Sequence, residues 1–188
     1  MYRATVEIQG LAPLSQSRQH WTPKLDGESN DEYDKRTWRE KANYDSLTGE
    51  IYVPAMALKQ AMDTAATRLS IPDPDNRKAK MTKYFVSEVI CESHLPIGAM
   101  KDEIPSVTIS AHVTGQRGSG ARVPRTFPQI QEWSGVTTFL IMNEKIKPDM
   151  FEQVLATAGR AIGVGQFRAE NGGLNGRFEV VKVKYEKI

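Results

Sequence analysis

The sequence has a single cysteine, Cys91, and only three histidines among 188 residues. One cysteine excludes an intramolecular disulfide, and it excludes zinc sites built on thiolates, which use two to four cysteines. No stretch approaches the roughly 18 apolar residues of a membrane-spanning helix. Residues 1–10 alternate in polarity and do not form the apolar block of a signal peptide. We therefore expect a cytoplasmic protein with no metal, no cofactor and no membrane contact.

Acidic side chains are absent from two windows that are rich in basic ones, residues 76–87 and 114–130. The net charge of +2 hides these windows, because 25 basic and 23 acidic residues nearly cancel over the whole chain. The basic residues of the two windows are Arg77, Lys78, Lys80, Lys83, Arg117, Arg122 and Arg125. Positive charge concentrated in this way predicts contacts with a polyanion.

Four acidic residues cluster elsewhere, at Glu28, Asp31, Glu32 and Asp34. Carboxylates at this density can hold a divalent cation for a metal-dependent nuclease. A solvated loop explains the same composition more simply, and we prefer that interpretation.

Hydrophobic periodicity predicts the secondary structure. Apolar residues alternate with polar ones over 2–9 and again over 106–113, which is typical of half-buried strands. Residues 55–69 follow Pro54 and place apolar side chains at spacings of three and four, which predicts an amphipathic helix. The other predicted elements are strands at 51–53, 86–92, 136–142 and 178–185 and a helix at 148–161.

Stripped of insertions, the order of these elements is strand, helix, strand, strand, helix, strand. This order predicts an α+β fold of the ferredoxin-like type, with an antiparallel sheet backed by two helices. In the RNA-recognition version of this fold, the open face of the sheet meets nucleic acid. We expect one domain over residues 1–188 with insertions at about 10–49 and 114–130, the second of them a flexible basic loop. The first insertion should be partly ordered, because it carries four aromatic residues, Trp21, Tyr33, Trp38 and Tyr44.

A glycine-rich segment, 159–178, separates the second helix from the last strand and holds six of the fourteen glycines. Glycine lets the backbone approach a ligand or another chain closely, and Arg168 and Arg177 add guanidinium groups suited to phosphate. Alternatively, the segment is a wide connection that needs glycine only for its turns. It is not a nucleotide-binding loop of the Rossmann or P-loop type, because those glycines follow a strand and open a helix.

Two stretches together resemble the RAMP superfamily of RNA-binding proteins, which includes CRISPR-associated backbone subunits and guide-processing endoribonucleases. One is YVPAMALKQAM at 52–62, which is similar to the family's P-x-x-x-L-K-x-A start of a helix; the other is the late loop GVG…GG…GRF at 163–178. Ala55, Met56 and Ala57 stand where the family has small Gly or Ser residues. The segments PLSQSR, RTWRE and GVGQFRAENGGLNGRF also resemble uncharacterised phage proteins, which places the chain in an infected bacterial host cell.

The resemblance implies that the chain binds single-stranded RNA or DNA without cleaving it and with tolerance for sequence, assembling along the strand as a homo-oligomer. The basic residues expected to contact nucleic acid are Arg18, Arg36, Arg39, Lys59, Lys80, Lys83, Arg117, Arg122, Arg125, Arg168 and Arg177. The glycines expected close to the ligand or a neighbouring subunit are Gly163, Gly165, Gly172, Gly173 and Gly176. Stacking on bases is the alternative to core packing for Trp21, Trp38, Tyr84 and Phe127.

Two other functions remain open. In the processing endoribonucleases of the family, a histidine soon after the first strand exchanges a proton with the RNA, and His20 lies in that part of this chain, with Lys24 and Tyr33 available to stabilise charge. We interpret His94 and His112 as ordinary polar positions. The third function is a protein-binding module that mimics a CRISPR backbone subunit and binds a phage or host protein.

Overall fold

We describe the protein from a computed structural model, for residues 1–112 and 120–188. The α-helices are α1 (Asn30–Thr37), α2 (Ala55–Leu69), α3 (Thr82–Glu88) and α4 (Pro148–Thr157), and the shorter helical turns are η1 (Trp38–Lys41), η2 (Ala158–Ile162) and η3 (Ala169–Asn171). The strands are β1 (Tyr2–Gly10), β2 (Leu14–Ser15), β3 (Glu50–Val53), β4 (Pro72–Asp73), β5 (Asn76–Lys80), β6 (Val89–Cys91), β7 (Leu95–Met100), β8 (Ser106–His112), β9 (Arg122–Ile130), β10 (Ser134–Ile141) and β11 (Phe178–Lys187).

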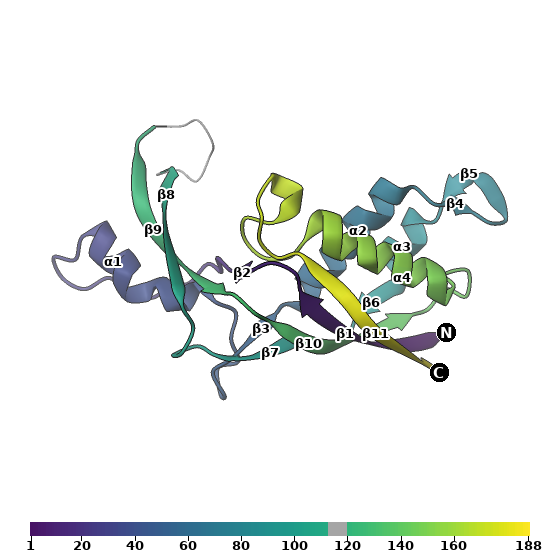
Figure 1. Cartoon of the computed structure of the whole chain (residues 1–188), viewed down its shortest axis with the longest axis horizontal. Coiled ribbons are helices and arrows are strands. Elements are labelled where there is room, and N and C mark those ends of the chain that lie inside the picture. Colours follow the sequence, from purple (N-terminus) through teal and green to yellow (C-terminus); the bar gives the residue numbers. More distant parts are fainter. Residues whose placement is uncertain (113–119) are drawn as a thin grey trace.

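The largest sheet has the strand order β11-β1-β10-β6, and each strand is antiparallel to its neighbours. The alternation in β1 buries Ala4, Val6 and Ile8 completely on one face. Helices α2 and α4 cover that face (Figure 1), where Phe139 of β10 meets Phe151 of α4 with ring centroids 5.4 Å apart. The predicted combination of helices with antiparallel sheets is therefore confirmed.

Helix α2 has the bounds that its periodicity predicts. Leu58, Met62 and Ala65 are buried, and the helix ends where Ser70 takes a left-handed conformation with φ of 47°. At its start, the backbone N–H of Ala55 donates to Nδ1 of His94 at 3.0 Å. His94 is therefore a capping residue for α2 and not merely an ordinary polar position.

The segment before β6 differs from the prediction. A strand is expected over 86–92, but α3 extends to Glu88 and only Val89–Cys91 are a strand. The buried amine of Lys59 explains part of the difference, because it donates at 3.1 Å to the carbonyl oxygens of Phe85 and Val86 at the end of α3. Such a contact between distant segments is invisible to local periodicity.

The β8–β9 hairpin replaces much of the predicted basic loop. A loop is expected over 114–128, yet Arg122–Ile130 form β9, which pairs with β8 from His112↔Arg122 to Ser106↔Pro128. Two prolines, Pro124 and Pro128, hide the strand, because proline rarely occurs inside a sheet. Likewise Pro96 and Gly98 hide β7, which pairs with β3.

The connection after β1 is folded and contains β2, α1 and η1. Helix α1 begins with a capping box in which Ser29 and Glu32 bond to each other's backbone N–H. It lies beside the β8–β9 hairpin, away from the largest sheet (Figure 1). The β4–β5 hairpin, which follows α2, lies at the opposite end of the molecule. In the described part of the chain, no helix is both long and apolar enough to cross a membrane.

Candidate nucleic-acid interface

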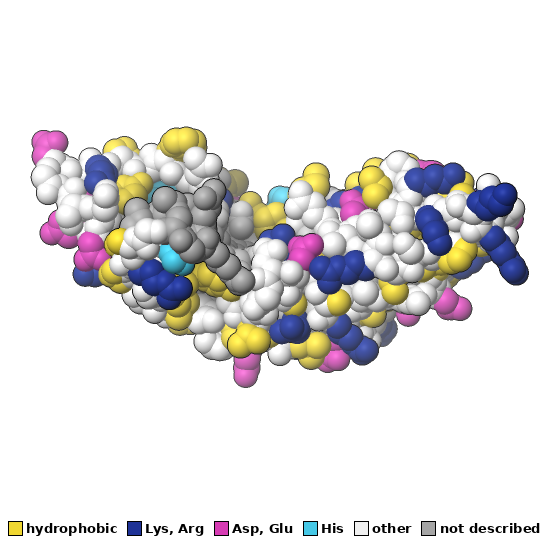
Figure 2. Space-filling view, turned by 90° about the horizontal axis from the view of Figure 1, so that it is seen from above, with side chains coloured by type: hydrophobic (Ala, Val, Ile, Leu, Met, Phe, Trp, Pro, Cys, Tyr) yellow, Lys and Arg dark blue, Asp and Glu magenta, His cyan; other side chains and the backbone are white. Residues whose placement is uncertain are grey.

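Three adjoining cavities form one groove across the middle of the molecule. The first, of about 320 Å³, lies between residues 14–18, the start of α2 and the glycine-rich loop. It shares Ala57, Gly165 and Arg168 with a smaller cavity of about 60 Å³. It shares Ser17 and Arg18 with a third cavity of about 330 Å³ beside α1 and β9. We call the three cavities together the groove; Figure 2 shows the molecule narrowing and dipping between its two ends.

The segment from Pro13 to Arg18 forms the floor of the groove. Backbone hydrogen bonds hold this segment from both sides. On one side, the N–H of Gly176 donates to Pro13 O at 2.8 Å and the N–H of Gln166 donates to Ser15 O at 2.7 Å. On the other side, the N–H of Arg18 donates to Lys41 O at 2.7 Å. The floor is therefore fixed by segments far from it in sequence.

The loop glycines serve close packing of the backbone. A Cβ atom on Gly165, whose φ is +77°, would lie 2.3 Å from Ser15 O, and one on Gly173 would lie 1.7 Å from Phe167 O. The wide connection that uses glycine for its turns therefore describes much of this loop. Gly163 and Gly165 line the groove, whereas the lining of the three cavities does not include Gly172, Gly173 or Gly176.

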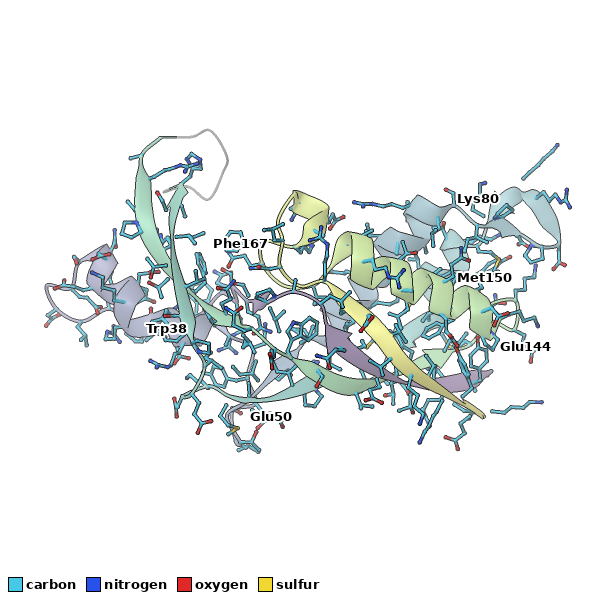
Figure 3. All side chains as sticks on the ribbon, in the orientation of Figure 1. Trp38, Glu50, Lys80, Glu144, Met150 and Phe167 are labelled. Atoms are coloured by element: carbon cyan, nitrogen blue, oxygen red, sulfur yellow. The ribbon has the colours of Figure 1, made fainter. Side chains whose placement is uncertain are left out.

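An aromatic contact joins the glycine-rich loop to the β8–β9 hairpin. The rings of Phe167 and Phe127 meet edge to face with centroids 5.6 Å apart. Phe167 lies on the part of the loop that faces the hairpin (Figure 3). Nζ of Lys41 lies 4.5 Å from the centroid of the Phe127 ring. This contact joins the glycine-rich loop, which lines the first two cavities, to the hairpin, which lines the third.

Three of the predicted arginines line the groove. Arg18 lies over the ring of Tyr44, with the guanidinium 4.7 Å from its centroid. Arg168 donates to Glu170 at 3.1 Å and lines the first two cavities. Arg125 enters the third cavity, 3.7 Å from the buried carboxylate of Asp34. Glu170 and Asp34 leave each guanidinium with spare donors, because arginine carries five N–H groups.

Lys41 lines the third cavity and was not predicted from the sequence. Its amine donates to Asp34 at 2.5 Å and to the Thr126 carbonyl oxygen at 2.6 Å, while the Thr126 N–H donates to Asp34 at 2.7 Å. Lys41 thus holds β9 against α1 and fixes where Arg125 lies. Its position next to a glutamate in a polar helical turn gave no signal of this role.

His20 opens into the same cavity as Arg18 and Arg125. Its Nδ1 lies 3.0 Å from the Thr22 hydroxyl, and its ring stacks on Tyr33 at 5.9 Å between centroids. Burial lowers the pKa of His20, so the imidazole is neutral at pH 7. Lys24 lies outside the cavity lining; it donates to Asn30 at 2.6 Å.

The side chains of four predicted basic residues bond to or pack on other groups of the protein. Lys59, which was expected to contact nucleic acid, is only 13% exposed, and its amine bonds to Asp63 and to α3. Arg36 forms a two-pronged ion pair with Glu28, at 2.6 and 2.9 Å. The remaining two are Arg39, which lies over the Trp38 ring, and Arg177, which donates to backbone carbonyl oxygens.

Of the remaining predicted basic residues, the three that the structure describes do not line the groove. Arg122 is exposed on the β8–β9 hairpin, 3.5 Å from Nε2 of His112. Arg117 lies outside the described residues. Lys80 is exposed at the opposite end of the molecule, in the β4–β5 hairpin (Figure 3), and Lys83 is exposed at the start of α3. The two acid-poor windows therefore do not form one surface.

Among the four aromatics considered for stacking, Trp21 is the one that presents its ring to solvent, at 85% exposure. It follows His20 directly in the chain. Trp38 and Tyr84 are half-buried, and Phe127 is buried. For these three, core packing is the role that their burial supports.

The carboxylates of the acidic cluster form ion pairs and hydrogen bonds with neighbouring parts of the protein. Besides the Arg36–Glu28 pair, Lys35 bonds to Asp31 at 2.6 Å, and Asp34 is buried against Lys41. The bonds from Arg36 lower the pKa of Glu28 to about 2. Across residues 1–112 and 120–188, no three His, Cys, Asp or Glu side chains gather closely enough to hold a metal ion.

The open face of the largest sheet has mixed charge. Arg3 and Glu92 form an ion pair at 2.6 Å, and Glu7 lies opposite Lys182. The residues of β1 on this face are Arg3, Thr5, Glu7 and Gln9, none of them aromatic. The stacking surface that RNA-recognition folds carry there is therefore not found on β1.

No protein-family model matches the sequence, and neither does any curated protein. The fold is similar to that of a chain in the cryo-EM structure of the Type III-B Cmr-beta bound to cognate target RNA, with a TM-score of 0.55 and 14% identity over 99% of this chain. The match covers 61% of that longer chain. Cmr6 from Pyrococcus furiosus matches with a TM-score of 0.48 and 13% identity, covering 96% of this chain and 99% of that one.

Proposed function

We propose that the chain binds single-stranded nucleic acid, RNA or DNA, along the groove, without cleaving it and with little preference for sequence. The observation that carries this proposal is the placement of Arg18, Arg125 and Arg168 along one continuous groove. Guanidinium groups pair with phosphate oxygens in any sequence, and an exposed ring such as Trp21 stacks on any base.

The fold supports the same proposal. The order β11-β1-β10-β6 is that of the last, first, third and second strands of a ferredoxin-like unit. The similar Cmr-beta chain belongs to an assembly bound to target RNA. As parts of the proposal, the chain is a phage-encoded RAMP relative, and it assembles along the strand with further copies of itself.

The test is fluorescence anisotropy of labelled single-stranded RNA, single-stranded DNA and duplex DNA over a salt series. We expect submicromolar binding to single strands that weakens steeply with salt, because each neutralised phosphate releases counterions. The variant Arg18→Ala/Arg125→Ala/Arg168→Ala should weaken binding by about 100-fold at low salt. Lys182→Ala/Lys184→Ala/Lys187→Ala on β11, which removes the same charge, is the control and should change binding less than threefold.

Two further measurements complete this test. Binding should quench the fluorescence of Trp21, and Trp21→Phe should remove that quenching, because Trp133 is buried and Trp38 half-buried. Size exclusion of the same mixtures reports assembly along the strand. No binding even at low salt would overturn the proposal and favour the protein-binding alternative, whose phage or host partner a pull-down would then seek.

An endoribonuclease is the second candidate function, because His20 shares its cavity with Arg18 and Arg125. Its lowered pKa favours the neutral imidazole, which is the form that accepts a proton. In this reaction, Nε2 takes the proton of a 2′-hydroxyl, the 2′-oxygen bonds to phosphorus, and the bond to the 5′-oxygen breaks. The proton then passes from His20 to the leaving 5′-oxygen, which leaves a 2′,3′-cyclic phosphate.

The two candidates separate with one substitution. His20→Ala should abolish cleavage of RNA and leave its binding within threefold of the original, while DNA, which lacks the 2′-hydroxyl, should stay intact with either protein. RNA that is still cleaved by the variant would rule out His20. RNA that stays intact with the original protein would leave the non-catalytic function.

A further inference from the structure

The β4–β5 hairpin carries a group of cations that the protein itself does not neutralise. Arg77, Lys78 and Lys80 lie on β5 and are exposed. Within the described residues, their side chains form neither an ion pair nor a hydrogen bond. Lys83 follows at the start of α3, with its amine 4.6 Å from the centroid of the Tyr84 ring. Four positive charges thus lie within seven residues.

The acidic residues beside this hairpin already have partners. Lys145 lies 3.2 Å from Asp73 and 2.7 Å from Asp75. The hydroxyl of Tyr84 also donates to Asp73, at 3.2 Å. Lys145 pairs with both of these carboxylates and offsets one of their two charges, so the face formed by β5 and Lys83 keeps a net positive charge.

Helix α2 sets the distance between this hairpin and the first cavity of the groove. The helix lines the first cavity at Ala57 and the second cavity as far as Thr64, and β4 follows directly after its last turn. From Ala57 to Leu69 the helix rises by about 18 Å, at 1.5 Å per residue. Figure 2 shows Lys and Arg side chains at the end that holds the hairpin, well away from the central dip.

The positive charges of β5 also indicate which kind of partner complements this face. A second copy of the chain would have to offer its acidic cluster, but Glu28 is paired with Arg36 and Asp31 with Lys35, and Glu32 caps α1. A strand of nucleic acid offers a phosphate every 3.4 Å when its bases are stacked. The unpaired cations of β5 therefore complement phosphates better than they complement the acidic surface of another copy.

We propose that the β4–β5 hairpin is a second phosphate contact for a strand bound in the groove, made by Arg77, Lys78, Lys80 and Lys83. The inference rests on the proposed function, since a strand held in the groove is what extends to the hairpin. Crossing about 18 Å takes about five stacked nucleotides beyond the first cavity. The hairpin contact therefore depends on the length of the strand.

The experiment measures the affinity of single-stranded oligonucleotides from about 6 to about 24 nucleotides, a range that brackets one groove and the added span. The test variant is Arg77→Ser/Lys78→Ser/Lys80→Ser, and the matched control is Lys182→Ser/Lys184→Ser/Lys187→Ser on β11. For long oligonucleotides, the test variant should lose tenfold or more in affinity and about two units of salt slope. For the shortest ones, it should stay within twofold of the control.

Each other outcome has a distinct meaning. If both variants lose affinity equally for oligonucleotides of every length, net charge alone explains the loss, and the inference is overturned. If affinity depends on oligonucleotide length in the hairpin variant as it does in the original protein, the inference is overturned as well. The variant of Arg18, Arg125 and Arg168 would still test binding in the groove. Loss of binding in the hairpin variant alone, with the groove variant unaffected, would instead overturn the proposed groove. If the hairpin variant changes only self-association without nucleic acid, the hairpin contacts protein.

Discussion

The end of the molecule that holds the largest sheet and the end that holds α1, β8 and β9, which we call the arm, are stabilised by different interactions. The sheet end buries apolar side chains such as Val6, Leu58 and Phe139 completely. The arm depends on a polar cluster, in which the buried carboxylate of Asp34 bonds to Lys41 and to the Thr126 backbone. A core of apolar side chains tolerates small changes in the angles at which the side chains pack. A buried ion pair stabilises the fold only when both charged partners are in position.

This comparison predicts two kinds of response to mutation. Damage to the sheet end should lower the stability of the whole fold. Damage to the polar cluster should release the arm while the sheet stays folded, because local opening occurs where apolar contacts are few.

The largest expected effect belongs to Phe139→Ala. The ring is fully buried against Phe151, so its removal should cost about 4 kcal/mol of unfolding free energy, measured by urea denaturation. Val136→Ala on the same strand is the control; its side chain is half exposed, and the cost should be below about 1 kcal/mol. Similar costs for the two variants would contradict the assignment of the core to this face.

Asp34→Ala comes next and tests the arm. It leaves the Lys41 ammonium and the Thr126 N–H without their buried partner, at a cost of about 3 kcal/mol. Hydrogen exchange should show lost protection in β9 and unchanged protection in β1. Asp31→Ala removes only the exposed pair with Lys35 and should change neither. Cooperative loss of protection in both strands would show that the arm and the sheet unfold together.

Gly165→Ala tests the joint between the two regions. The new Cβ would meet Ser15 O at a backbone φ of +77°, so we expect about 2 kcal/mol of destabilisation and tenfold weaker binding of single strands. Gly98→Ala is the matched control: its φ is +69°, but the added Cβ has open space. Equal effects of the two substitutions on binding would mean that backbone strain, and not the fit of the loop on the floor, controls the groove.

The smallest effect concerns pH at the arm. Arg36 lowers the pKa of Glu28 from 4.5 to about 2, so the Glu28–Arg36 pair stabilises the folded arm at pH values above 4.5. That contribution should be lost as the pH falls from 4.5 through about 2, when the carboxylate is protonated. Comparing the pH profiles of thermal stability for the original protein and Glu28→Gln measures it. Parallel profiles would show that the pair contributes nothing.

The same contrast explains what the sequence could predict. Strand β1 and helix α2 follow from local periodicity, and the structure has both where they were expected. Helix α3 and strand β9 do not follow from local periodicity. The end of α3 bonds to Lys59, and β9 pairs with β8, so both elements depend on other parts of the chain. The elements that the sequence misses are those held by contacts between distant residues.

For the groove, residue type alone was an incomplete guide. Arg18, Arg125 and Arg168 were predicted and do line the groove. Arg36 has the same side chain, yet Glu28, eight residues away, neutralises it. Whether a cation is free depends on which carboxylates the fold brings to it, and charge patterning does not contain that information.

The floor of the groove has a consequence for the time at which the protein becomes competent to bind. Residues 13–18 are made long before their partners Gln166 and Gly176. Strand β1 likewise waits for both β10 and β11. A nascent chain therefore exposes Arg18 before the groove exists, and the groove forms only after residues 166–176 have left the ribosome and bonded to residues 13–18.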